Sequence, residues 1–229
     1  MKRKVFSLVL LLGIGIMALQ IPFSVLVGGE NQHFSLFDFM APSLGGFLGP
    51  FVGVISVIGI KVVNVLIHKG SFDMVTIIRL FPLAAGALYF SLKKYRPLMA
   101  IIPVAAIILF VAHPEGRAAW YYSLYWLIPI VALFARKSLV FTALGSTFTA
   151  HAVGGVAFLY AFNLPAAAWI ALIPVVFVER MIFTAGVVVF YLVTNSALAK
   201  LSTFPRFSVV SRLVNHNYVL SSTFFKKFV

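Results

Sequence analysis

The sequence contains no cysteine and very few acidic residues. The absence of cysteine excludes disulfide bonds, thiol catalysis and cysteine-ligated metal sites. Only 10% of the 229 residues are charged and 62% are hydrophobic, which leaves too little polar surface for a water-soluble domain of this size. Lys and Arg number 18 against 5 Asp and Glu. Most basic residues lie between apolar segments or in the C-terminal tail. They therefore indicate membrane topology and contact with anionic lipids, and no nucleic-acid partner is expected.

What the sequence does contain is a series of long apolar segments. A backbone in lipid must satisfy its own hydrogen bonds, and long runs without alternation favour helices over a β-barrel. We therefore expect an all-α, polytopic integral membrane helical bundle with six to eight transmembrane segments. The segments are expected near residues 5–27, 36–48, 50–68, 74–92, 98–112, 118–135, 138–161 and 167–197.

Basic clusters set the expected orientation. Lys2, Arg3 and Lys4 predict a cytoplasmic N-terminus, and an even number of crossings places both termini in the cytoplasm. The first apolar run lacks a small-x-small cleavage site and is interpreted as a retained helix rather than a signal peptide. We expect a transmembrane domain over 1–200. The basic segment 201–229 is expected in the cytoplasm, on the inner leaflet or against a partner, most simply at a prokaryotic plasma membrane.

Two adjacent charged residues, Glu179 and Arg180, lie deep inside the last apolar segment. A charge at that depth is costly and normally faces a helix interface or a watery cavity. Adjacent positions on a helix point about 100° apart, so we expect one side chain to line a cavity and the other to bond a neighbouring helix. The alternative is a structural ion pair with Lys61 or Arg79, which is weak evidence for stability because desolvation offsets the attraction.

Polar residues also interrupt three other apolar segments. Lys61 and Asn64 share one stripe of a helix, Arg79 can hold a carboxylate or phosphate bidentately, and His151 lies beside glycines that leave room for a ligand. The structural alternatives are that Lys61 snorkels, Asn64 makes one interhelical hydrogen bond, and His151 is a packed hydrogen-bonding residue. The excess of positive charge predicts a small-molecule substrate with an anionic group. The expected substrate-binding residues are Lys61, Asn64, Arg79, His151, Glu179 and Arg180.

Enzyme motifs are absent from the sequence. It contains no H-E-x-x-H, no G-x-S-x-G and no Walker sequence. We therefore expect no catalytic activity, no cofactor and no metal site. Without a nucleotide site, the chain would need partner subunits to power any uptake by hydrolysis.

The stretch 34–70 carries a distinctive pattern. It begins with aromatic-Ser-Leu-x-Asp, continues as a short apolar helix, and passes through a Gly-Pro turn into a helix with regularly spaced glycines. The residues are Phe34, Ser35, Leu36, Asp38, Gly45, Gly49, Pro50 and Gly53. This pattern resembles the substrate-binding (S) components of energy-coupling factor (ECF) transporters. Close helix packing is expected at Gly45, Gly49 and Gly53.

The resemblance implies a function. S components typically have six helices, bind a vitamin or similar micronutrient in a cavity open to the outside, and associate with a membrane coupling protein and two ATPase subunits. It implies that this chain is the substrate-capture subunit of an ECF-type importer, with the loop 28–35 over the cavity. Three other functions remain open, namely a non-catalytic membrane scaffold of a cell-envelope complex, a stand-alone secondary transporter and a lipid-handling enzyme.

Overall fold

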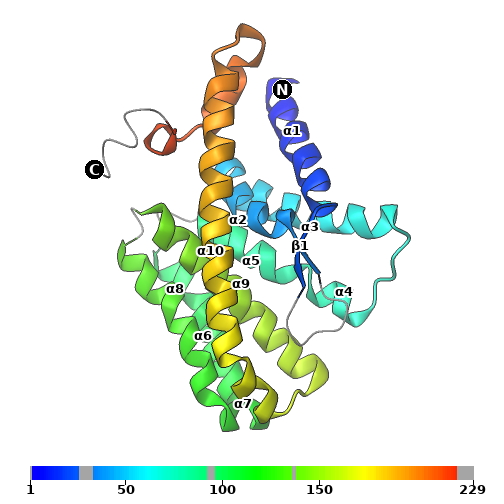
Figure 1. The fold of residues 1–229 in the computed structure, drawn as a ribbon, viewed down its shortest axis with the longest axis vertical. Coiled ribbons are helices and arrows are strands. Elements are labelled where there is room, and N and C mark those ends of the chain that lie inside the picture. The colour runs from blue at the N-terminus through cyan, green and yellow to red at the C-terminus, as the bar shows by residue number, and fades with distance from the viewer. Residues whose placement is uncertain (1, 26–32, 92–95, 136–137, 221–229) are drawn as a thin grey trace.

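The computed structural model describes all residues except 1, 26–32, 92–95, 136–137 and 221–229. The described chain is built almost entirely from helices, so the predicted all-α fold is confirmed (Figure 1). The helices are α1 Lys2–Leu19, α2 Leu36–Leu48, α3 Pro50–Ile67, α4 Met74–Ile78, α5 Phe81–Ser91, α6 Arg96–Ala112, α7 Pro114–Ala118, α8 Leu127–Ala132, α9 Leu139–Phe162 and α10 Ala166–Ser202. Short 3-10 helices and one strand pair complete them: η1 Trp120–Trp126, η2 Leu133–Ala135, η3 Pro205–Leu213, η4 His216–Tyr218, β1 Pro22–Val25 and β2 His33–Ser35.

Four of the described helical segments are long and apolar enough to cross a membrane. They are Pro50–Ile67, Met74–Ser91, Leu139–Phe162 and Ala166–Ser202. Four shorter apolar helical segments accompany them, at Val9–Leu19, Leu36–Leu48, Leu98–Ala112 and Trp120–Ala135. The eight apolar segments found in the sequence therefore correspond to eight helical segments, of which length and composition make four able to span.

Several predicted boundaries differ from the structure. Helix α1 ends at Leu19, and the chain then forms β1, which pairs antiparallel with β2. The expected helix over 74–92 is broken between α4 and α5, where Pro82 has no N–H to donate to the carbonyl of Ile78. Of the loop 28–35, residues 28–32 lie outside the described residues and 33–35 form β2.

Helices α2 and α3 form a hairpin that turns at Gly49 and Pro50. Gly49 has a φ of 82°, which favours glycine, and Pro50 begins α3, where its missing N–H costs nothing. A Cβ on Gly45 would collide with the carbonyl of Ala87, and one on Gly53 would lie 2.6 Å from the Cα of Gly45. Gly45 and Gly53 thus allow close helix contacts, whereas the space around Gly49 is open and that residue shapes the turn.

The Ser-Leu-x-Asp sequence has a local structural role at the start of α2. The carboxylate of Asp38 accepts hydrogen bonds from the backbone N–H of Ser35, at 2.7 Å, and from its hydroxyl, at 3.1 Å. An acid in the third helical position that reaches back to the N-cap residue satisfies a backbone donor that the helix leaves free. This part of the pattern is therefore a helix start.

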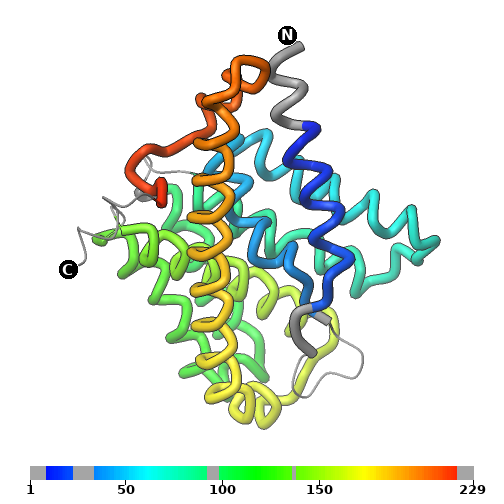
Figure 2. Tube along the Cα trace, turned by 45° about the horizontal axis from the view of Figure 1, so that its top comes forward, coloured from blue at the N-terminus to red at the C-terminus, as the bar shows by residue number. Residues whose placement is uncertain are grey.

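Two large apolar cores and a small third cluster, which contains Tyr89, Met99 and Leu133, hold the described helices together. The first includes Phe37, Leu44 and Tyr191 and joins α1, α2, α3, α5 and the second half of α10. The second includes Phe110 and Trp126 and joins α6, η1, the end of α9 and the first half of α10. Helix α10 runs along the long axis of the molecule and takes part in both cores (Figures 1 and 2).

The segment after α10 packs back onto that helix. The side-chain amide of Asn195 donates to the carbonyls of Asn215 (2.8 Å) and Tyr218 (2.9 Å), and its oxygen accepts from the N–H of Asn215 (2.8 Å). Val210 of η3 is buried in the first core. The boundary predicted at residue 200 falls inside α10, and the described residues beyond it belong to the same packed unit.

Candidate functional site

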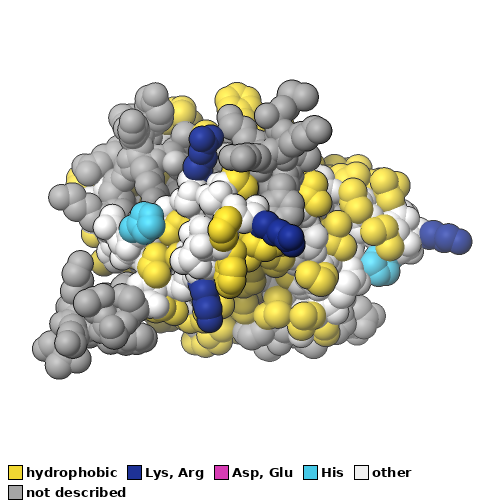
Figure 3. Space-filling view, turned by 90° about the horizontal axis from the view of Figure 1, so that it is seen from above, with side chains coloured by type: hydrophobic (Ala, Val, Ile, Leu, Met, Phe, Trp, Pro, Cys, Tyr) yellow, Lys and Arg dark blue, Asp and Glu magenta, His cyan; other side chains and the backbone are white. Residues whose placement is uncertain are grey.

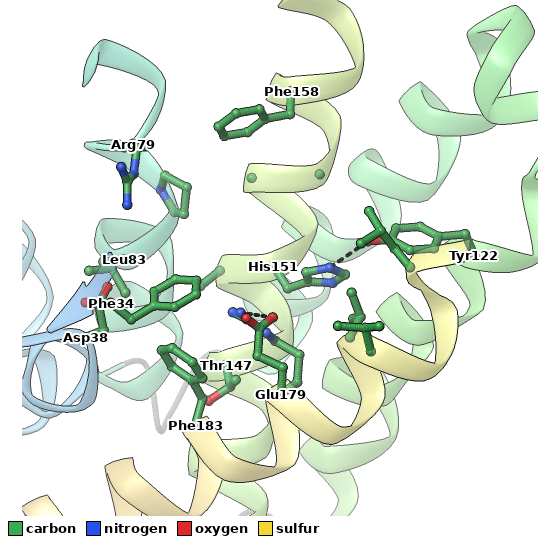
Figure 4. Close-up of a pocket in the computed structure, with 18 of the residues that line it drawn as sticks. Phe34, Asp38, Arg79, Leu83, Tyr122, Thr147, His151, Phe158, Glu179 and Phe183 are labelled. Atoms are coloured by element: carbon green, nitrogen blue, oxygen red, sulfur yellow. Dashed lines mark hydrogen bonds and ion pairs between the residues drawn. The ribbon is translucent and has the colours of Figure 1, made fainter. Parts of the chain in front are cut away.

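A cavity of about 570 Å³ lies between α2–α5 on one side and α9–α10 on the other. That volume falls within the range of roughly 300–1,000 Å³ typical of small-molecule sites. Its wall is mainly apolar and aromatic, and Figure 4 shows how side chains from both sides point into it. The polar lining residues are Asp38, Lys61, Arg79, Tyr122, Thr147, His151, Glu179 and Arg180.

Five of the six residues expected to bind substrate line this cavity, namely Lys61, Arg79, His151, Glu179 and Arg180. The fold brings them together from α3, the break between α4 and α5, α9 and α10. Asn64 is not among the lining residues. Its side-chain oxygen accepts a hydrogen bond of 2.9 Å from Gln20, which follows α1, so Asn64 makes the interhelical bond that was the structural alternative.

One end of the cavity carries Lys61, Arg79 and Asp38. The ammonium of Lys61 donates a 2.6 Å hydrogen bond to the backbone carbonyl of Arg79. That carbonyl lies where the helix breaks between α4 and α5, so the break supplies an acceptor for a cation that would be costly to bury. Arg79, Asp38 and Phe34 lie on the same side in Figure 4. Lys61 and Arg79 carry two positive charges and Asp38 one negative charge, so this end of the cavity has a net positive charge. We call it the cationic end.

The opposite wall carries Glu179 and Arg180, which pair with each other. The guanidinium nitrogen lies 2.5 Å from the carboxylate oxygen. The expectation that adjacent helix positions keep these side chains apart is wrong, because the long arginine side chain spans the angle between them and both residues line the cavity. The guanidinium also lies 4.5 Å from the ring centroid of Phe183 and 5.6 Å from that of Phe34. Cation–π contact with two rings fixes its position.

His151 is held between two aromatic residues of η1. The indole N–H of Trp126 donates to Nδ1 at 3.1 Å, and the hydroxyl of Tyr122 lies 2.9 Å from Nε2. An indole nitrogen can only donate, so Nδ1 must be unprotonated. The described residues contain no group of three His, Asp or Glu side chains placed to hold a metal ion. His151 therefore acts as a hydrogen-bonding residue in the wall.

Sequence reasoning missed several wall residues. Tyr122 lines the cavity, and Trp126 holds the lining residue His151. Both lie in the aromatic-rich stretch Trp120–Trp126, which the sequence pattern indicates only as part of an apolar segment. Thr147 lies four positions before His151 and therefore on the same helix face, a spacing that could have assigned it to the site. Asp38 was noted only as part of the pattern at the start of α2.

Comparison with known proteins finds no family model, no curated protein and no solved structure that matches this chain.

Proposed function

We propose that this chain is a multi-pass protein of the cell membrane that captures a small molecule, as the substrate-binding subunit of an ECF-type importer. The observation that carries the proposal is the convergence of Lys61, Arg79, His151, Glu179 and Arg180 on one cavity of about 570 Å³. A cluster of ionisable side chains inside apolar helices is expensive, and such clusters mark ligand or ion sites in membrane proteins.

The surface of the helices supports a membrane location. Large apolar side chains are exposed along the candidate spans, among them Phe51 (82%), Ile55 (65%) and Leu66 (61%) on α3 and Val178 and Val189 on α10. An exposed apolar surface of this extent would be an aggregation hazard in water but suits contact with lipid chains.

The distribution of charge supports the proposed orientation, with both termini of the chain in the cytoplasm. The start of α1 and the end of α10 lie at the same end of the molecule (Figure 1). Seen from that end, the described charged side chains in view are basic and none is acidic (Figure 3). Lys200, Arg206 and Arg212 are exposed on the end of α10 and on η3. This arrangement fits the positive-inside rule and contact with anionic lipids.

The length of α10 agrees with this arrangement. Its 37 residues correspond to about 55 Å at 1.5 Å per residue, whereas the hydrocarbon core is about 30 Å thick. The helix can therefore cross the bilayer and still project beyond it. The projecting part carries Lys200 and the docked segment from η3 onward, a position suited to a coupling protein and ATPase subunits.

Native mass spectrometry of the full chain, gently purified from its host's membranes, tests the proposal. A matched pair of variants places leucine at two helical glycines. A Cβ on Gly154 would have no neighbour closer than 3.5 Å, and Gly154 lines the cavity. A Cβ on Gly13 would have no neighbour within 4 Å, and Gly13 does not line the cavity. We expect a small molecule on the wild type and on Gly13→Leu but not on Gly154→Leu, because the new side chain fills the cavity.

Co-purification of a membrane coupling protein and ATPase subunits is expected with the wild type and both variants. A ligand-free wild-type chain that co-purifies only with other membrane proteins would contradict the proposal and favour a scaffold. Movement of substrate by the chain reconstituted alone would favour a secondary transporter instead.

A further inference from the structure

The cavity wall formed by Tyr122, Thr147 and Arg180, here the donor wall, has hydrogen-bonding capacity that the described protein does not use. The hydroxyl of Thr147 and the Nε–H of Arg180 are buried and have no partner among the described residues. Thr147 is only 4% exposed. A buried donor or acceptor without a partner destabilises the fold, so unpaired groups that line a cavity indicate a partner that occupies it.

The arrangement around His151 adds a third unused donor. Because Trp126 donates to Nδ1, the proton of the neutral ring is on Nε2, and this N–H donates to the oxygen of Tyr122. Tyr122 therefore keeps its own hydroxyl proton, and His151 is its one hydrogen-bond partner among the described residues. The ring of Tyr122 is 1% exposed and lines the cavity. Its hydroxyl proton is available to a ligand.

The charges on this wall decide what kind of ligand group fits. The guanidinium of Arg180 already pairs with the carboxylate of Glu179, so the donor wall and Glu179 together carry no excess charge. A carboxylate of the ligand at this wall would lie close to the carboxylate of Glu179, and like charges at close range in a poorly hydrated site repel strongly. A neutral acceptor avoids that cost. An amide group presents a carbonyl acceptor and an N–H, and the hydroxyl of Thr147 can serve either.

We infer that the donor wall binds a neutral amide-type group of the ligand, such as a lactam, a ureido group or a carboxamide, attached to an apolar or aromatic body. The apolar body is accommodated by the aromatic lining around it, which includes Phe183, Phe158 and Trp169. This assignment rests on the proposed capture function and names the ligand group that meets this part of the site. The cationic end with Lys61 and Arg79 is left for any anionic group.

Two probes of the same shape test the assignment. The lactam 3,4-dihydroquinolin-2-one carries the carbonyl, and 1,2,3,4-tetrahydroquinoline lacks it. Binding to the full chain in lipid nanodiscs is measured for the wild type, Thr147→Val and Thr149→Val. Thr149 is the matched control because its hydroxyl is also buried and unpartnered among the described residues, but it does not line the cavity. Both variants should fold, since each removes an unpaired buried hydroxyl.

We expect the lactam to bind the wild type more tightly than tetrahydroquinoline. Thr147→Val should weaken lactam binding about fivefold, the equivalent of one hydrogen bond of ~1 kcal/mol, and Thr149→Val should leave it unchanged. Tetrahydroquinoline should bind all three proteins alike. Equal binding of the two probes to the wild type, or equal effects of the two valine variants, would overturn the assignment while leaving small-molecule capture intact. If neither probe binds, and native mass spectrometry finds no small molecule on the wild type, both proposals fail together.

Discussion

Two adjacent glycines on α9 should respond in opposite ways to the same substitution. A Cβ on Gly155 would lie 2.8 Å from Cζ2 of Trp126, whereas a Cβ on Gly154 would meet only Pro82, at 3.5 Å. Trp126 is fully buried, packs edge-on against Phe110 and donates to His151, so it cannot move without losing contacts. Overpacking of this kind costs about 1–3 kcal/mol. Alanine also gains about 0.5–1 kcal/mol over glycine in a helix, and this gain applies at both positions.

The gain in helix propensity therefore cancels when Gly155→Ala is compared with Gly154→Ala. What remains is the overpacking, and we expect the free energy of unfolding to differ by about 1–3 kcal/mol, with Gly155→Ala the less stable. Denaturant titration in mild detergent, followed by tryptophan fluorescence, measures this difference. Equal stabilities would show that Trp126 is not held as tightly as its contacts imply. The hydrogen bonds of His151 with Trp126 and Tyr122, which depend on the position of Trp126, would then no longer be supported.

Two further predictions concern the ends of the helical bundle. Asn195→Ala removes three hydrogen bonds that hold the segment after α10. Limited trypsin digestion should therefore cut this variant faster at Arg206 than it cuts the wild type. Ser196→Ala removes one hydrogen bond to the same segment and should have a smaller effect. At the start of α4, the N–H of Thr76 donates to the carboxylate of Asp73 at 2.8 Å and lowers its pKa. The cap is therefore complete above the ordinary carboxyl pKa and is lost as the pH falls through the lowered value. Hydrogen exchange at the Thr76 amide should show this pH dependence in the wild type and lose it in Asp73→Asn, whose neutral side chain still accepts a hydrogen bond.

Much of the fold was predictable because long apolar runs and Gly-Pro pairs act locally. The run lengths located all eight helical segments, and Gly49 with Pro50 marked the hairpin between α2 and α3. The strand pair after α1 was not predictable in this way. An apolar run continues through Pro22, and the pairing of β1 with β2 depends on residues that come later in the chain.

The lining of the candidate site was also predictable in part, because charged and polar residues inside apolar runs can be recognised locally. Isolated charged and polar residues in apolar runs stand out, and five of the six residues chosen on that basis line one cavity. Tyr122 could not be placed, because its partner His151 is 29 positions away and no local pattern links them. The pairing of Glu179 with Arg180 could not be read from helix geometry, which gives the direction of the Cβ atoms but not the path of a long flexible side chain.

The scarcity of acids gives the cavity its polarity. Four acids are described: Asp38, Asp73, Glu115 and Glu179. Three of them accept hydrogen bonds at helix starts, where a carboxylate meets free N–H groups and the positive end of the helix dipole. Asp38 caps α2 and Asp73 caps α4. Glu115 accepts from the N–H of Ala166, at the start of α10, at 2.7 Å. The fourth pairs with Arg180. The carboxylate of Asp38, which shares the cationic end with Lys61 and Arg79, also caps α2. Two cations and one carboxylate leave the cationic end with an excess of one positive charge. On the proposed function, a ligand with its amide-type group at the donor wall would direct an anionic group to that end and so bind in a single orientation.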